Sequence, residues 1–214
     1  MSWDDTIDRL YMEHGATDDF DRALIAAMLE LLGTGPEHSP KVQDAVARTW
    51  VGIMSPIQAK PAALWRQIFE TVGAIAFHRP IPTEPSVVYR IALPDWAWGW
   101  SWSSDPCSGM RSDNIDLATA FDYQRWAIPK QCWYRTTVDP SAIRIAIPDG
   151  FPVKWRGVTR LSIDELVVDP SMLSHVEQVS PKEMRETFFV EKTKPLNPLL
   201  KSSEIGASSG GELT

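Results

Sequence analysis

The stretch Val87–Asp105, VVYRIALPDWAWGWSWSSD, carries the strongest chemical signal in this sequence and shapes its expected architecture. A short run of strand-forming residues leads into Arg90, and three tryptophans then precede the polar segment SWSSD. Two hydroxyl groups beside a fixed guanidinium would suit an anionic ligand, and exposed indoles would suit a flat ring. On the alternative interpretation, the tryptophans form core, Arg90 lies at the surface and the serines make a turn.

The alternation of side chains along a strand predicts which residues of SWSSD share a face. Residues i and i+2 lie on the same side of a strand. We therefore expect Ser101 and Ser103 on one side, with Trp100 and Trp102 on the other.

Composition and charge limit the classes of function. The chain has 214 residues, of which 43% are hydrophobic, so it suits one medium domain or a domain with an extension. Its net charge of -7 argues against a large basic surface for nucleic acid. We find neither an apolar run of about 20 residues nor a basic-then-apolar N-terminus, so we expect a cytoplasmic protein without a membrane span.

Cysteine and histidine are too scattered in the sequence to indicate a metal site. Cys107 and Cys132 match no metal or redox spacing, and two cysteines do not make a disulfide framework. The histidines form no i, i+4 pair and have no ligand-type spacing to a cysteine. They are His14, His38, His78 and His175.

Residues 1–80 are predicted to form a helical N-terminal region, because apolar residues recur there at helical spacing. We expect a helix over Trp3–His14, a second that ends before Gly33, a third that starts at Pro40 and a fourth opened by Pro61. Their apolar faces carry no cluster of charged or ligating residues, so we interpret these helices as packing elements. The apolar stripe of the third helix comprises Val42, Val46, Trp50 and Met54.

A proline-rich segment, His78–Ser86, leads into residues 86–190, which show mainly β patterns. A helix is expected over Leu117–Trp126, a capping box at Ser180 opens a last short helix, and residues 192–214 are predicted to be disordered. The expected fold class is α+β, with a helical region followed by a mixed, split β-sheet domain. The predicted strands are Val87–Ala92, Gly99–Ser103, Cys132–Val138, Ala142–Ile147, Leu166–Val168 and His175–Val179.

A third motif, far down the chain, completes the first two. The segment Ser162–Pro170, SIDELVVDP, places an acidic pair at the entrance of an apolar strand. The order Tyr-Arg, then Ser-Trp-Ser-Ser-Asp, then Glu-Leu-Val-Val-Asp-Pro resembles the mono-ADP-ribosyltransferase superfamily of the arginine–serine–glutamate type. The resemblance extends over about residues 87–179. Within it, Trp133–Ile147 is similar to the family's middle strand and Ala118–Phe121 to one of its helices.

The resemblance implies an ADP-ribosyltransferase-like domain with an NAD cleft between the halves of its sheet. It implies that Glu165 is the catalytic carboxylate, which stabilises positive charge on the ribose as the bond to nicotinamide breaks. Arg90 would hold the diphosphate or the adjacent ribose, and Ser101 would bond the nicotinamide ribose or hold Glu165. Ser103 would support the strand edge beside NAD. The spacing does not choose which aromatic ring stacks on the nicotinamide, and the candidates are Trp102, Trp100 and Tyr134.

The sequence departs from the arginine-modifying members of this family at one position. Those members carry a second Glu or Gln two residues before the catalytic glutamate, where this chain has Ile163. Asp164 is adjacent, but on a strand it would point to the opposite face. The resemblance therefore implies an acceptor other than arginine, or hydrolysis of NAD. The polar segment Pro106–Asn114 is interpreted as a mobile loop over the cleft.

Three functions are compatible with these residues. The first is transfer of ADP-ribose from NAD to a macromolecular target, most simply a protein, by a phage-encoded or toxin-like modifier. The second is an NAD glycohydrolase that uses the same residues. The third is a non-catalytic protein-binding module in which the Trp96–Trp102 surface and the helical region contact a partner. The acidic balance disfavours a nucleic-acid target.

Overall fold

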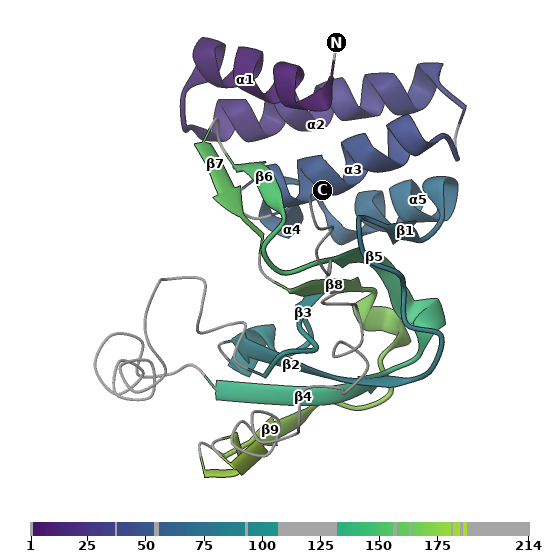
Figure 1. Cartoon of the computed structure of the whole chain (residues 1–214), viewed down its shortest axis with the longest axis vertical. Helices are drawn as coiled ribbons and strands as arrows, with labels where there is room; N and C mark the ends of the chain where they lie inside the picture. Colours follow the sequence, from purple (N-terminus) through teal and green to yellow (C-terminus); the bar gives the residue numbers. More distant parts are fainter. Residues whose placement is uncertain are drawn as a thin grey trace, which may run out of the picture.

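The computed structural model shows an α+β protein built in three layers (Figure 1). It describes residues 2–36, 38–53, 56–92, 94–106, 132–155, 158–162, 164–180, 182–184 and 186–187. Helices form the upper layer in Figure 1, a four-stranded sheet lies in the middle, and a three-stranded sheet lies below it. The α+β class expected from the sequence is therefore confirmed.

The upper layer contains the α-helices, and local sequence explains where several of them begin. The Ser2 hydroxyl accepts a hydrogen bond from the Asp5 N–H, and the Asp5 carboxylate accepts one from the Ser2 N–H, so a capping box starts the first helix. The third helix begins at Pro40, and Ser39 caps it. Proline is tolerated in the first turn because N–H groups there have no partner within the helix. The described helices are α1 Trp3–His14, α2 Asp18–Thr34, α3 Pro40–Gly52, α4 Pro56–Ala59 and α5 Ala62–Val72.

The end of α2 differs from the sequence expectation. The helix continues through Gly33 to Thr34, and the N–H of Gly35 donates to the Leu31 carbonyl at 2.9 Å. Glycine in a helix costs about 1 kcal/mol relative to alanine but does not by itself stop the helix. The Thr34 hydroxyl donates to the Glu30 carbonyl at 3.0 Å and supports the extra turn. The predicted end before Gly33 is therefore wrong.

Two sheets make up the lower layers. The middle sheet has the order β1-β5-β8-β3 and is mixed, because β1 runs parallel to β5 while the other pairs are antiparallel. The lower sheet has the order β2-β4-β9 and is antiparallel, and β6 and β7 form a separate hairpin. The described strands are β1 Ile75–Ala76, β2 Ser86–Ala92, β3 Ser101–Trp102, β4 Cys132–Val138, β5 Ile143–Ile147, β6 Pro152–Trp155, β7 Val158–Leu161, β8 Glu165–Val168 and β9 Glu177–Val179.

The six predicted strands are confirmed, with shifts of one or two residues at six of their twelve ends. Three strands were not predicted: β1 and the two strands of the hairpin. β1 pairs with β5, and β6 and β7 pair with each other. Their place in the fold depends on pairing with partners rather than on their own pattern.

Alternation along the middle sheet divides the interior into two cores. Ile145 and Val167 face the helices and belong to a cluster that we call the helix-side core. Ala146 and Leu166 face the lower sheet and belong to the sheet-side core. Because both faces of this sheet are covered, β5 and β8 are apolar along most of their length.

The two tryptophans on either side of Ser101 enter different cores. Trp100 lies in the helix-side core, whereas Trp102 lies in the sheet-side core. Alternation applies only within a strand, and β3 begins at Ser101, after the bend that holds Trp100. The expectation that the two indoles share a face is therefore wrong.

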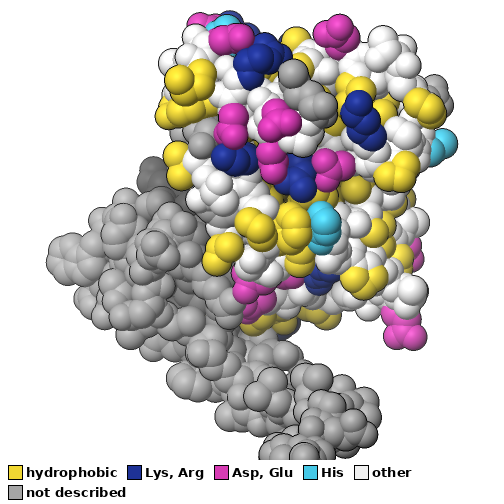
Figure 2. Space-filling model, turned by 45° about the horizontal axis from the view of Figure 1, so that its top comes forward, with side chains coloured by type: hydrophobic (Ala, Val, Ile, Leu, Met, Phe, Trp, Pro, Cys, Tyr) yellow, Lys and Arg dark blue, Asp and Glu magenta, His cyan; other side chains and the backbone are white. Residues whose placement is uncertain are grey.

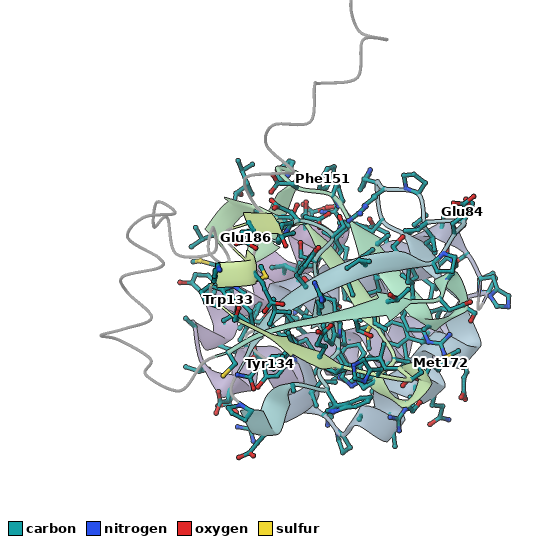
Figure 3. The ribbon with its side chains drawn as sticks, turned by 90° about the horizontal axis from the view of Figure 1, so that it is seen from below. Glu84, Trp133, Tyr134, Phe151, Met172 and Glu186 are labelled. Carbon is teal, nitrogen blue, oxygen red and sulfur yellow. The ribbon has the colours of Figure 1, made fainter. Side chains whose placement is uncertain are left out.

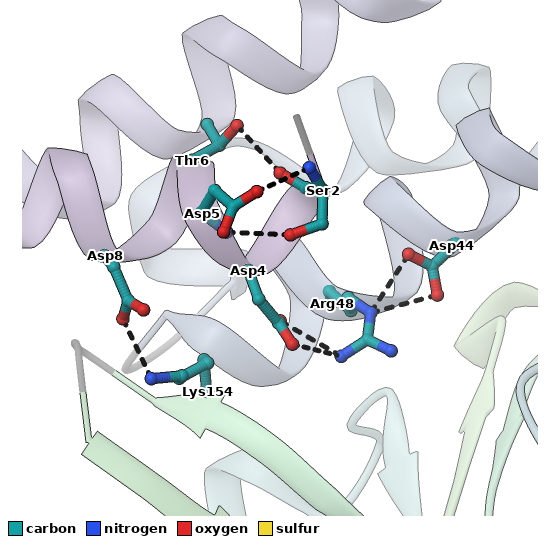
Figure 4. A network of polar contacts seen from close by, with 8 residues as sticks. All are labelled: Ser2, Asp4, Asp5, Thr6, Asp8, Asp44, Arg48 and Lys154. Atoms are coloured by element: carbon teal, nitrogen blue, oxygen red, sulfur yellow. Dashed lines mark hydrogen bonds and ion pairs between the residues drawn. The ribbon is translucent and has the colours of Figure 1, made fainter.

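Ion pairs connect α1 with α3 and with the hairpin (Figure 4). Arg48 of α3 contacts Asp4 of α1 at 3.1 Å and Asp44 of its own helix at 3.0 Å. Lys154 of β6 contacts Asp8 of α1 at 3.0 Å. Partly exposed pairs of this kind contribute about 1 kcal/mol or less each, so they orient elements that the helix-side core holds together.

Some sequence predictions concern residues that the structure does not describe. They are the helix Leu117–Trp126 with its family-like part Ala118–Phe121, the loop after Pro106, the residue Ile163 and the tail 192–214. The capping box at Ser180 is present, because the Glu183 N–H donates to the Ser180 hydroxyl at 3.2 Å and the Glu183 carboxylate accepts from the Ser180 N–H at 2.9 Å. Across the described ranges, no helix has the length and apolar character needed to span a membrane.

Candidate functional site

The short strand β3 brings the three sequence motifs together. It lies at the edge of the middle sheet, where Ser101 pairs with Val167 of β8. Just beyond β3, Ser103 bridges to Tyr89 of β2 through backbone hydrogen bonds of 2.7 and 2.9 Å. The arginine, serine and glutamate strands are therefore neighbours in space, although their motifs are far apart in the sequence.

Arg90 reaches from the lower sheet to the edge of the middle sheet. It lies on the same face of β2 as Val88 and Ala92, which both belong to the sheet-side core. Its Nη1 donates to the Ser101 carbonyl oxygen at 2.6 Å. Burial lowers the pKa of the Arg90 guanidinium from its ordinary value, and the nearby Glu165 carboxylate acts in the opposite direction. An arginine side chain keeps its proton under such conditions, so this position holds a positive charge.

Gly99 lies directly against the Arg90 guanidinium. A Cβ atom at this position would lie 2.2 Å from the Arg90 Cζ, so any side chain here would displace the guanidinium. The Gly99 carbonyl accepts a hydrogen bond from the Trp102 indole at 2.7 Å, and this bond ties the glycine to β3. Glycine therefore allows the Arg90 guanidinium to approach the backbone closely at this point.

Glu165 is half-buried at the start of β8 and lies on the helix-facing side of the middle sheet. It pairs with Ile147 and lies two residues from Val167, which pairs with Ser101. Directly paired residues share a face, so the side chains of Ser101 and Glu165 lie on the same side. The Glu165 Oε1 accepts a hydrogen bond from the indole N–H of Trp50 in α3 at 3.1 Å.

Trp50 is the site residue that sequence reasoning missed. It is 3% exposed, and its ring lies 5.0 Å from that of Trp65 and 6.1 Å from that of Trp100, measured between centroids. The apolar stripe of α3 accounts for the ring but not for the N–H. A buried indole N–H usually has a hydrogen-bond partner, so a tryptophan in a core stripe indicates that an acceptor lies nearby. The identity of the partner depends on the tertiary structure.

Asp164, the neighbour of Glu165, belongs to a separate cluster of polar contacts. Its Oδ2 accepts hydrogen bonds from the Ser103 hydroxyl at 2.6 Å and from the Ser104 N–H at 2.7 Å. Its Oδ1 forms an ion pair with Arg79. We call these residues, Arg79, Ser103, Ser104 and Asp164, the Asp164 clasp. The clasp joins the chain before β2 to the end of β3 and the start of β8.

The other predicted NAD contacts occupy packing positions. Trp102 is 2% exposed and Tyr134 is 5% exposed, and both belong to the sheet-side core. Tyr134, labelled on β4 in Figure 3, pairs with Arg90 across β2 and β4. Burial raises the pKa of Tyr134, and a hydrogen bond with Cys132 acts in the same direction. Among the described tryptophan side chains of this stretch, Trp98 is largely exposed, at 52%.

Figure 2 shows acidic and basic side chains interleaved on one face of the molecule. Within the described part of the chain, no group of three or more His, Cys, Asp or Glu side chains is placed to hold a metal ion. The site offers a guanidinium, a carboxylate and a hydroxyl group. Such a set can attract an anionic ligand and stabilise a cation that develops beside the carboxylate.

Comparison with protein-family models, with curated proteins and with solved structures finds no match to this chain. A functional assignment must therefore come from the residues and their geometry. The family resemblance stated above stays a prediction.

Proposed function

We propose that this chain binds NAD at Arg90, Ser101 and Glu165 and transfers its ADP-ribose group to a macromolecular target, as a mono-ADP-ribosyltransferase-like domain. The observation that carries the proposal is the 2.6 Å hydrogen bond from Arg90 to the Ser101 carbonyl, close enough to Glu165 for that carboxylate to influence the guanidinium. Three strands thus supply the residue types that the reaction requires. A protein target and a cytoplasmic setting are part of the proposal.

The proposed reaction breaks the bond between C1′ of the nicotinamide ribose and the ring nitrogen. The electron pair of that bond leaves with nicotinamide, whose ring nitrogen becomes neutral, and C1′ becomes electron-deficient. A carboxylate at Glu165, hydrogen-bonded to a ribose hydroxyl, stabilises this cation more than it stabilises bound NAD. A lone pair of the acceptor then bonds to C1′, and the acceptor releases one proton to solvent. Because nicotinamide leaves as a neutral ring, the leaving group needs no second carboxyl as an acid.

The proposed contacts with NAD differ in part from those that the sequence suggested. The Arg90 guanidinium attracts the diphosphate through its charge, and the Ser101 hydroxyl binds the nicotinamide ribose on the face shared with Glu165. Trp102 is enclosed in the sheet-side core, so we assign it to packing. Trp98 offers the exposed ring on which a flat group of NAD can stack.

An NAD glycohydrolase is the second candidate, favoured by the contacts of Asp164. That carboxylate binds Arg79, Ser103 and Ser104, so it is already engaged in structural contacts rather than in orienting an acceptor. The position from which arginine-modifying members of the family orient their acceptor, two residues before the catalytic glutamate, holds Ile163. With water as the acceptor, the same residues would release ADP-ribose and nicotinamide.

The test is incubation of the purified protein with NAD, with nicotinamide release followed by chromatography. Glu165→Gln should lower release by about 10²- to 10³-fold, because it removes the charge that stabilises the cation. The matched control is Glu177→Gln, which changes the first residue of another strand, β9, where the carboxylate pairs with Arg135 at 2.8 Å. Release by the control should match that of the wild type.

The outcomes separate the candidates. Release that depends on an added protein fraction, with ADP-ribose attached to that fraction, supports the transferase. Release with free ADP-ribose as the product supports the glycohydrolase. If NAD neither turns over nor raises the melting temperature of the protein, the proposal is wrong and the protein-binding module becomes the better hypothesis.

A further inference from the structure

We propose that Trp50 is a positioning residue for Glu165, so that the N-terminal helices complete the catalytic site. This inference rests on the proposed function, because it concerns the part that Glu165 plays in turnover. Its structural basis is the hydrogen bond from the Trp50 indole to the Glu165 carboxylate, which can be examined without any turnover.

The position of the Trp50 indole is tightly restricted. Its ring packs at 5.0 Å from Trp65, with the planes 79° apart, and at 5.9 Å from Phe69. The ring of Trp100 lies 6.1 Å away on the strand side of the cluster. An indole that is enclosed in this way and 3% exposed has few alternative rotamers, so its N–H points toward Glu165 in a defined direction.

The aromatic cluster is also tied to the strand that carries Glu165. The Trp100 carbonyl accepts a hydrogen bond from the Val168 N–H, at the far end of β8, at 2.7 Å. The Arg66 guanidinium lies over the Trp100 ring, 5.7 Å from its centroid, and donates to Asp169, directly after β8, at 3.2 Å. The aromatic cluster that holds the donor, Trp50, is therefore attached to β8, the strand that carries the acceptor, Glu165.

A fixed donor on one carboxylate oxygen has a specific consequence for the proposed chemistry. The bond to Oε1 restricts rotation of the carboxylate and leaves Oε2 to accept from a ribose hydroxyl. It also opposes rotation of the carboxylate toward Arg90, where an ion pair would draw both charges away from NAD. An arrangement formed before the substrate binds needs no reorganisation during the reaction.

The test replaces the N–H donor and keeps an aromatic ring. Trp50→Phe should leave the dissociation constant for NAD, measured by titration calorimetry, within about twofold, and should lower kcat for nicotinamide release roughly 10- to 100-fold. The matched control is Trp65→Phe, because Trp65 lies in the same cluster and its indole donates to the Pro56 carbonyl at 2.9 Å instead. A role in packing alone would make the two variants behave alike.

A second measurement tests the bond itself in the folded protein with Trp50 intact. In ¹⁵N-labelled protein, the indole N–H resonance of Trp50 is identified by its absence from Trp50→Phe, or by sequential assignment if that variant does not fold. Glu165→Gln exchanges a charged acceptor for a neutral one, so the Trp50 resonance should shift while the Trp65 resonance stays in place.

The outcomes distinguish the inference from the function on which it rests. A lower kcat for Trp50→Phe than for Trp65→Phe, together with a shifted Trp50 resonance, supports the role of Trp50. Equal turnover of the two variants, or an unmoved resonance in Glu165→Gln, overturns that role and leaves the proposed function standing. If the wild type neither binds NAD nor releases nicotinamide, the proposed function fails, and the role of Trp50 in turnover fails with it.

Discussion

Asp164 and Glu165 are adjacent carboxylates in very different surroundings. Asp164 is enclosed by the clasp, where it accepts hydrogen bonds from Ser103 and Ser104 and pairs with Arg79. Glu165 is half-buried, accepts one bond from Trp50 within the described residues, and influences Arg90 through its charge.

The two carboxylates differ in how many of their acceptor sites the protein itself fills. A carboxylate has about four acceptor sites, and the clasp occupies both oxygens of Asp164 with donors from the protein. Glu165 keeps one oxygen without a described hydrogen bond, on the face that it shares with Ser101. An acid whose contacts are complete stabilises the fold, whereas an acid with acceptor capacity left can bind a ligand.

Replacement of Glu165 is expected to have the largest effect on activity. Glu165→Gln should lower nicotinamide release by about 10²- to 10³-fold while it changes the free energy of unfolding by about 1 kcal/mol or less, since the amide keeps an acceptor for Trp50. Urea denaturation measures the second quantity. If Glu165→Gln destabilises the fold enough to account for the loss of activity, Glu165 is a structural acid like its neighbour.

The clasp should show the opposite behaviour. Asp164→Asn leaves the guanidinium of Arg79 without its ion-pair partner and presents an amide N–H₂ to donors, so it should destabilise the fold by about 2–4 kcal/mol. Urea denaturation monitored by circular dichroism gives this value. If Asp164→Asn is as stable as the wild type, the clasp does not secure the start of β8.

A substitution at Gly99 tests the role of the Arg90 guanidinium by displacing it. Gly99→Ala places a Cβ against the flexible end of Arg90, so the guanidinium should leave the Ser101 carbonyl and NAD affinity should fall about tenfold, with a small loss of stability. Titration calorimetry with NAD measures the change. The control is Gly33→Ala in α2, where nothing lies within 4 Å of the new Cβ, and this variant should bind NAD normally and be slightly more stable. Equal affinities in both variants would remove Arg90 from the proposed site.

The smallest expected effect concerns two turns with the same sequence, Asp-Pro-Ser. Burial acts to raise the pKa of Asp169, but hydrogen bonds from Ser171 and the contact with Arg66 outweigh it and lower the pKa below 3.8. A lowered pKa contributes stability above the unfolded value, and that contribution is lost as the pH falls through the folded value. Asp169→Asn should therefore lower the melting temperature near neutral pH, and its difference from the wild type should shrink below about pH 4.

Asp139 provides the internal control for that measurement. It makes the same turn, with Ser141 donating to its carboxylate at 2.9 and 2.6 Å, but it is exposed. Asp169 also contacts Arg66 at 3.2 Å and Arg144 at 3.6 Å, and no such arginine contact is described for Asp139. Asp139→Asn should change the melting temperature less than Asp169→Asn at neutral pH. Equal changes would mean that the arginine contacts of Asp169 add nothing to the shared turn.

Much of the fold was predictable because the relevant signals are local. The capping boxes at Ser2 and Ser180, the proline at the start of α3 and the strand-forming residues of β4 and β5 depend on residues within a few positions of one another. The strands β1, β6 and β7 were missed, and their pairing with β5 and with each other is not specified by the local pattern.

The candidate site divides in the same way. The motif residues Arg90, Ser101 and Glu165 were identified from the order of their residue types, and the structure places their strands side by side. The assignment of Trp102 and Tyr134 to NAD requires exposed rings, but both rings are buried. The sequence does not specify which aromatic rings the fold buries. The helical pattern predicts Trp50 only as a packing residue, because its hydrogen-bond partner lies more than a hundred positions away in the sequence.

The local sequence was enough to predict the helical region, the positions of most strands and the three residues proposed for the site. The packing of distant elements establishes which of two adjacent acids is enclosed in the clasp, which tryptophan enters which core, and which indole reaches Glu165. The physical reason is that helix caps and strand patterns are set by neighbours in the chain, whereas burial, ion pairing and hydrogen-bond partners are set by elements that meet only after folding.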